Sequence, residues 1–139
     1  MTRPTPHHFG VTVADLDRAV DFYREAFDLG PAERFSVAGE AFSTAVDVDG
    51  ATGRFAHFTL DGARIELVEY DPAGADATGS EVNQPGAKHL GLAVDDLDAF
   101  YADLDPSVET VSEPQTTASG TRICFVRDPE ENLIEILEA

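Results

Sequence analysis

The apolar positions of the first half alternate and then change to a helical spacing. Residues 7–13 alternate between small and bulky side chains, which predicts a strand. The apolar residues after Asp15 recur at the spacing of a helix face and predict a helix with Asp15 as its N-cap; they are Leu16, Ala19, Val20, Tyr23 and Phe27. Further strand patterns cover 33–37, 54–60 and 63–70, and Asp61-Gly62 predicts a hairpin turn between the last two.

The second half repeats this order. A strand pattern covers 89–94, and Asp96 precedes a second helical stripe of Leu97, Phe100, Tyr101 and Leu104 that Pro106 ends. Strand patterns follow at 108–113, 121–127 and 133–138. The motif H-x-G-x-x-V-x-D-L-D begins at His8 and again at His89, and such self-similarity predicts two copies of one strand–helix–strand–strand–strand module.

The loop-forming residues of 72–87 separate the two copies. We therefore predict a first βαβββ module at 7–71, a linker at 72–87 and a second module at 88–139. Each module is too small to bury a large core alone, so we expect the two to pack together.

The charge balance excludes several classes of function. Asp and Glu total 27 against 9 Lys and Arg, a net charge of −18, with Lys88 as the sole lysine. This field repels phosphate backbones and argues against nucleic-acid binding, while it suits either a salt-adapted source or an ordinary acidic enzyme. No apolar run is long enough to span a membrane, and no secretory signal is visible, so we expect a cytoplasmic protein. Cys124 lies in an apolar run and is expected to be a buried, inert thiol.

One His and one Glu stand at matching places in each copy. Strand parity puts His8 with Gly10 and Thr12, and His89 with Gly91 and Ala93, so each imidazole has small neighbours on its face. Glu66 and Glu135 interrupt apolar strands, where a carboxylate is costly unless it is paired or bound to a metal. The repetition favours one divalent metal held by His8, Glu66, His89 and Glu135; zinc, nickel, cobalt, manganese and ferrous iron all suit these ligands.

The other histidines and two further strand glutamates are not predicted to bind the metal. His7 lies on the other face and is expected at the surface. His57 could line the pocket, although the pattern favours a structural role. Glu69 and Glu138 have the opposite parity from the proposed ligands and are interpreted as ordinary surface acids.

The run from His8 to Tyr23, together with the run from Phe125 to Asn132 that leads into Glu135, resembles the vicinal oxygen chelate superfamily. That superfamily includes glyoxalase I, methylmalonyl-CoA epimerase, extradiol dioxygenases, fosfomycin-resistance enzymes and bleomycin-resistance proteins. The resemblance covers residues 7–138. It implies an α+β fold in which two paired βαβββ modules form a curved mixed sheet around a metal-binding cleft, with ligands at His8, Glu66, His89 and Glu135.

A quartet of two His and two Glu most resembles glyoxalase I. This likeness implies a metal-dependent lyase or isomerase that acts on a thiohemiacetal of a 2-oxoaldehyde, or on a related carbonyl compound, through an enediolate at the metal. It favours Glu135 as the catalytic base and Glu66 as its partner. Thr12 and Tyr70 depart from the pattern, since bacterial glyoxalase I typically has an Arg and an Asn there that serve glutathione.

Other members of the superfamily suggest alternatives. These are a ferrous extradiol-type dioxygenase, an enzyme like methylmalonyl-CoA epimerase, or a metal-free binding protein of the bleomycin-resistance kind. The fourth ligand argues against the dioxygenase, and the intact quartet argues against the metal-free protein. Such modules often pair across two chains, so we expect a homodimer that binds a small-molecule substrate.

Overall fold

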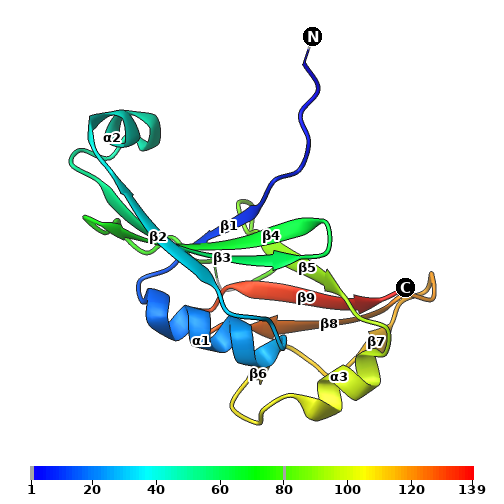
Figure 1. Cartoon of the computed structure of the whole chain (residues 1–139). Helices are drawn as coiled ribbons and strands as arrows, with labels where there is room; N and C mark the ends of the chain where they lie inside the picture. Colours follow the sequence, from blue (N-terminus) through cyan, green and yellow to red (C-terminus); the bar gives the residue numbers. More distant parts are fainter. Residues whose placement is uncertain (1, 80) are drawn as a thin grey trace. The chain divides into compact units, whose positions relative to one another are not determined.

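Two compact units, residues 1–76 and 77–139, make up the chain (Figure 1). The structure is a computed structural model that describes residues 2–79 and 81–139. Met1 and Ser80, the latter in the predicted linker, lie outside the described residues. The predicted module bounds of 7–71 and 88–139 stay a prediction.

The first unit is a four-stranded mixed sheet with two helices. Its elements run β1 (Phe9–Thr12), α1 (Leu16–Ala26), β2 (Glu33–Ala38), α2 (Glu40–Val46), β3 (Thr52–Leu60) and β4 (Ala63–Asp71). The strand order is β1-β4-β3-β2, with β1 parallel to β4 and the other neighbours antiparallel. In Figure 1, β2 leads from the end of α1 to α2.

The second unit has the equivalent strand order, with shorter central strands and a two-residue strand, β6, in the place of β2. Its elements run β5 (His89–Ala93), α3 (Leu97–Asp103), β6 (Glu109–Thr110), β7 (Gln115–Thr116), β8 (Arg122–Arg127) and β9 (Leu133–Glu138). The sheet order is β5-β9-β8-β6, again with one parallel pair at β5 and β9, and β7 also pairs with β8. The predicted α+β class is confirmed, and the mixed strands form one sheet in each unit.

Most of the apolar stripe predicted for the first helix forms part of the core of its unit, whereas in the stripe predicted for the second helix Leu97 alone is buried and Phe100, Tyr101 and Leu104 are half-buried. Leu16, Ala19, Val20 and Tyr23 of α1 are buried, as are Ala56, Phe58, Ile65 and Leu67 of the sheet beside it. In the second unit, Leu97 of α3 is buried, and so are Val126, Ile134 and Ile136. Cys124 is free and buried as expected, and its burial raises the pKa of the thiol.

Two details of the predicted order were wrong. The segment before β3 contains α2, a helix of seven residues that was not predicted and has no buried residue. Of the strand predicted at 108–113, only Glu109–Thr110 is a strand, β6, and a second short strand, β7, follows at Gln115–Thr116. Pro114, which has no backbone N–H to give to a ladder, stands between them.

Glu69 and Glu138 are not ordinary surface acids. The Glu69 carboxylate accepts a hydrogen bond from the backbone N–H of Leu16 at 2.8 Å, and Glu138 accepts one from Leu97 at 2.7 Å. These amides belong to the first residues of α1 and α3, which lack partners inside their helices. Each carboxylate therefore ties the last long strand of its unit to the start of the helix.

Candidate metal centre and its surroundings

The first unit brings two of the predicted ligands together. His8 Nε2 lies 3.2 Å from Glu66 Oε2. Glu66 stands opposite Gly10 in the parallel pairing of β1 with β4. A Cβ atom at Gly10 would lie 3.4 Å from Glu66 Oε2 and 3.7 Å from the His8 ring. The glycine of the repeated motif therefore leaves space for the side chains of both predicted ligands.

His57 is the residue of this site whose contact the sequence analysis missed. It stands opposite Glu66 in the antiparallel pairing of β3 with β4, and its Nε2 lies 2.8 Å from Glu66 Oε1. An ionised carboxylate only accepts hydrogen bonds, so the proton lies on His57 Nε2. Glu66 thus has one imidazole at each oxygen, His57 at Oε1 and His8 at Oε2.

A signal for this contact was present in the chain. The predicted Asp61-Gly62 turn joins two strands, and a two-residue hairpin loop sets the register of the strands on either side. Pairing outward from Leu60 and Ala63 brings His57 opposite Glu66. The prediction of a structural role for His57 used the composition of its strand and did not use this register.

His7 is exposed, as expected, and it contacts the ring of His8. The two Nδ1 atoms lie 2.8 Å apart, and Arg64 Nη1 lies 3.4 Å from His7 Nε2. One set of tautomers satisfies these contacts: Arg64 donates to His7, His7 donates through Nδ1 to His8, and His8 donates through Nε2 to Glu66. A metal ion held at His8 Nε2 would take the place of that last proton, so metal binding would be linked to the tautomer of His8.

The second unit has a matching pair with one difference. His89 Nε2 lies 3.4 Å from Glu135 Oε1, and Gly91 stands opposite Glu135. The place that corresponds to His57 is taken by Phe125, which pairs with Glu135 and has its ring 5.3 Å from that of His89. Within the described residues, His89 is the one polar partner of the Glu135 carboxylate.

Each pair fits a metal ion. Two ligand atoms about 2.1 Å from one ion, at tetrahedral or octahedral angles, lie roughly 3.0–3.4 Å apart. The His–Glu separations of 3.2 and 3.4 Å match this range. The imidazoles are about 40% exposed, whereas the carboxylates are mostly buried, so a ligand can reach the imidazole nitrogens. No three His, Cys, Asp or Glu side chains in the described ranges are arranged around a common metal position, so the joint site of His8, Glu66, His89 and Glu135 stays a prediction.

Aromatic side chains lie on the same face of the first sheet as His57 and Glu66. Phe35 stacks on Phe55, with ring centres 5.1 Å apart, and meets the edge of His57 at 4.9 Å. Phe42 of α2 stacks on Tyr70 at 6.2 Å. We call Phe35, Phe42, Phe55 and Tyr70 the aromatic cluster. The aromatic cluster supplies an apolar surface next to His57 and Glu66, and its Phe35 ring is exposed.

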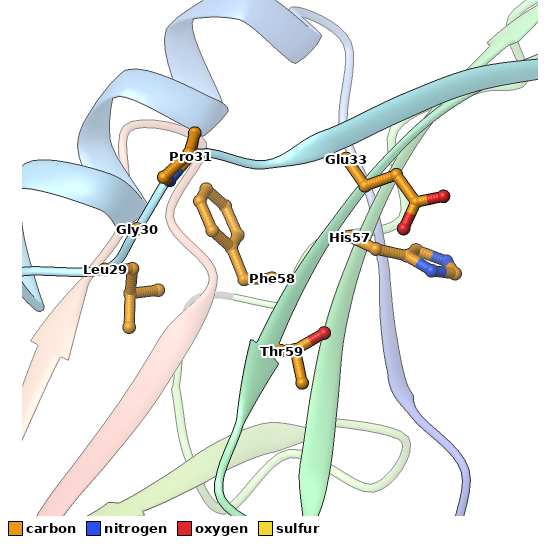
Figure 2. Close-up of a pocket in the computed structure, with 7 residues that line it drawn as sticks. All are labelled: Leu29, Gly30, Pro31, Glu33, His57, Phe58 and Thr59. Atoms are coloured by element: carbon orange, nitrogen blue, oxygen red, sulfur yellow. The ribbon is translucent and has the colours of Figure 1, made fainter.

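A cavity of about 240 Å³ lies at the edge of this sheet, where the chain passes from α1 to β2. Its wall consists of Leu29, Gly30, Pro31, Glu33, His57, Phe58 and Thr59. Figure 2 shows Glu33 and His57 projecting side by side from neighbouring strands. The two residues stand opposite each other in the pairing of β2 with β3.

The family of the chain follows from comparison with known proteins. The family model described as the Glyoxalase/Bleomycin resistance protein/Dioxygenase superfamily matches residues 5–136. The chain belongs to this superfamily, which confirms the resemblance found in its motifs.

Individual relatives place the chain within this superfamily. A 2-epi-5-epi-valiolone epimerase of an Actinomyces species is 32% identical over 120 residues, which cover 82% of this chain and 66% of the epimerase. The chain therefore spans just under two thirds of the length of that relative. A glyoxalase family protein of Bacillus cereus is 27% identical, with a TM-score of 0.84 over 99% of this chain and 95% of the other.

A more distant structure shares the fold alone. The trypanothione-dependent glyoxalase I of Leishmania major is 23% identical, with a TM-score of 0.59 over 94% of this chain and 84% of the other. Among the described residues, no helix has the length and apolar character needed to cross a membrane.

Proposed function

We propose that this protein is a metal-dependent isomerase that moves a proton at the carbon next to a carbonyl group, with an epimerase reaction on a small cyclic ketone as its leading form. The observation that carries the proposal is the His–Glu pair in each unit, with nitrogen and oxygen atoms 3.2 and 3.4 Å apart. The epimerase relative supports the reaction class.

His8, Glu66, His89 and Glu135 would together hold the ion, either within one chain or across a homodimer. A divalent ion at such a site stabilises the negative charge that forms on a carbonyl oxygen when the neighbouring proton leaves. The mixed nitrogen and carboxylate donors suit zinc, nickel, cobalt, manganese or ferrous iron.

Glu135 is the better candidate for the base. Its Oε1 faces His89, and its Oε2 has no polar partner among the described residues, whereas both oxygens of Glu66 contact an imidazole. In the proposed step the C–H bond breaks, Glu135 takes the proton, and the electron pair moves toward the carbonyl oxygen. Glu66 is the proposed partner that returns a proton on the opposite side.

The aromatic cluster supports a cyclic substrate. Its exposed ring, Phe35, packs against His57, which in turn contacts Glu66. A substrate ring that rests on Phe35 would therefore lie near the proposed metal ligands. Aromatic faces bind the apolar faces of rings and leave the hydroxyl groups free for polar partners. The epimerase relative is named for a valiolone, and we propose a substrate of that class here.

A deuterium-exchange assay tests the proposal. The protein is loaded in turn with nickel, zinc, cobalt and manganese and incubated with 2-epi-5-epi-valiolone in heavy water, and NMR follows deuterium entering next to the carbonyl. We expect exchange together with the epimer, and we expect Glu135→Gln to lower the rate about 10²–10⁴-fold. Glu113→Gln, an exposed acid of the same unit, is the matched control and should keep the wild-type rate.

Two outcomes would contradict the proposal. Wild-type activity in Glu135→Gln would remove the base from the mechanism. An inactive epimerase assay, combined with turnover of methylglyoxal and a thiol, would assign the protein to the glyoxalase I reaction instead.

A further inference from the structure

A row of side chains crosses the first sheet at the level of Glu66. The pairings place Glu33 of β2 opposite His57 of β3, His57 opposite Glu66 of β4, and Glu66 opposite Gly10 of β1. Residues directly opposite each other in a sheet point to the same face. His57 therefore sits between Glu33 and Glu66, and Gly10 leaves the far side of Glu66 open.

The contacts of Glu66 divide its two oxygens between different partners. Oε1 accepts a hydrogen bond from His57 Nε2 at 2.8 Å, and Oε2 faces His8 Nε2 at 3.2 Å. With Oε1 held in this way, the carboxylate cannot rotate without losing a hydrogen bond to a mostly buried partner. Oε2 is then the Glu66 oxygen that would face an ion held by His8.

His57 is itself held in place. Its side chain is 12% exposed. Its ring lies 4.9 Å from that of Phe35 and perpendicular to it, and 6.2 Å from that of His8 at an angle of 26°. A hydrogen-bond donor fixed by packing restricts its acceptor more than a mobile surface donor does.

Among the described residues of the second unit, Glu135 has no second imidazole partner that corresponds to His57. Phe125 occupies the position of His57 and has no hydrogen bond to give, so the Glu135 carboxylate keeps one imidazole partner among the described residues. The repeat preserves the His–Glu pair in both halves and changes the side chain behind it in one.

We infer that His57 is a positioning residue that fixes the Glu66 carboxylate for metal binding and makes the first His–Glu pair the more rigid half of the site. The inference rests on the metal-binding part of the proposed function. Partners of this kind, which touch a ligand and not the metal, typically change metal affinity 10–100-fold when they are removed.

Metal affinity measured directly on the full chain tests this role. Calorimetric titration of the metal-free protein with Mn²⁺, and the EPR spectrum of the bound ion, are compared for wild type, His57→Phe and His57→Gln. We expect His57→Phe to weaken Mn²⁺ binding about 10–100-fold. The amide of His57→Gln can still donate to Glu66, so this variant should bind within a few-fold of wild type. Phe125→Leu changes the matching place of the second unit and should also bind like wild type.

The outcomes separate this inference from the proposed reaction. Unchanged affinity in His57→Phe overturns the positioning role, and so does an equal loss in both His57 variants, because His57 would then be a ligand itself. A similar loss in Phe125→Leu also overturns it, since packing alone would explain the effect. Weakened binding in His57→Phe but no epimerase activity in wild type supports the role of His57 and overturns the reaction. A wild-type protein that binds none of the metals overturns both.

Discussion

Glutamates three positions apart on the same strand have different tasks in this protein. Glu66 faces His8 and His57, whereas Glu69 accepts a hydrogen bond from the first amide of α1. Glu135 and Glu138 repeat this division in the second unit. Because successive side chains of a strand point to opposite faces, an odd spacing sends one carboxylate to the open face and the other to the helix. Residue type alone does not reveal this division.

The two motif glycines should respond differently to the same substitution. A side chain at Gly10 would press on Glu66, since a Cβ atom there already lies 3.4 Å from Oε2, whereas a Cβ atom at Gly91 meets nothing within 4 Å. We expect Gly10→Val to displace the Glu66 carboxylate and to weaken Mn²⁺ binding at least about tenfold. Changes to groups that support a metal ligand typically reduce metal affinity by this factor or more. Gly91→Val, the matched control, should bind Mn²⁺ much more nearly as wild type does.

Calorimetric titration of the metal-free variants measures this difference. Equal affinities for Gly10→Val and wild type would show that Glu66 has room to move or does not bind the ion. Circular dichroism of both variants confirms that each keeps its fold.

At the scale of elements, both units fasten their helices in the same way. Asp15 and Asp96 are N-caps that accept hydrogen bonds from Arg18 and Ala99, and the strand acids Glu69 and Glu138 accept from the first residue of each helix. Negative charge at a helix N-terminus also interacts favourably with the helix dipole. The first of these contacts is local, whereas the second joins residues far apart in the chain and so holds the helix to its sheet.

Removing a strand acid should therefore destabilise the protein. Glu69→Ala leaves the amide of Leu16 without its charged partner, and a hydrogen bond to a charged group contributes about 1.5–3 kcal/mol. We expect the free energy of unfolding in urea to fall by about that amount. Glu113→Ala removes the same charge from an exposed loop and should change stability by less than about 0.5 kcal/mol. Equal stabilities of the two variants would show that the contact contributes nothing.

At the scale of the whole molecule, the net charge of −18 opposes folding. Like charges brought together in a compact chain repel one another, and the 9 basic residues cannot neutralise 27 acids. Several of those bases are already engaged: Arg34 contacts Asp17 at 2.6 Å, and this hydrogen bond, with the guanidinium charge, lowers the pKa of the Asp17 carboxyl. Most of the carboxylates therefore have no basic side chain to neutralise them, and their charge is balanced by water and dissolved cations.

Salt should consequently stabilise the fold. The distance over which charges interact falls from about 10 Å at 0.1 M salt to about 3 Å at 1 M, which screens the repulsion. We expect the melting temperature to rise by at least about 3 °C between 0.05 and 1 M KCl, roughly the shift that 1 kcal/mol causes in a domain of this size. Differential scanning calorimetry at constant pH measures it. A melting temperature that stays constant or falls over this range would contradict the argument.

The sequence predicted the elements better than it predicted their contacts. The caps at Asp15 and Asp96 and the buried stripe of α1 were all visible in local spacing, and each is confirmed. Helix α2 was missed because its one aromatic anchor, Phe42, contacts Phe55 and Tyr70, which lie well beyond it in the chain. The contact of His57 with Glu66 follows from the register of the Asp61-Gly62 hairpin, which the composition of the His57 strand does not show.

The sequence by itself determined the repeat, the face on which each strand residue lies and the candidate ligands His8, Glu66, His89 and Glu135. These follow from the periods of strands and helices, which are properties of the backbone. The Asp61-Gly62 turn also sets the register that brings His57 opposite Glu66, but only the tertiary structure decided that their side chains form a hydrogen bond. It also decided that Glu69 meets the start of α1 and that Phe42 meets Tyr70. These last two contacts depend on the packing of a helix against a sheet, which the periodicity of a single strand or helix does not describe.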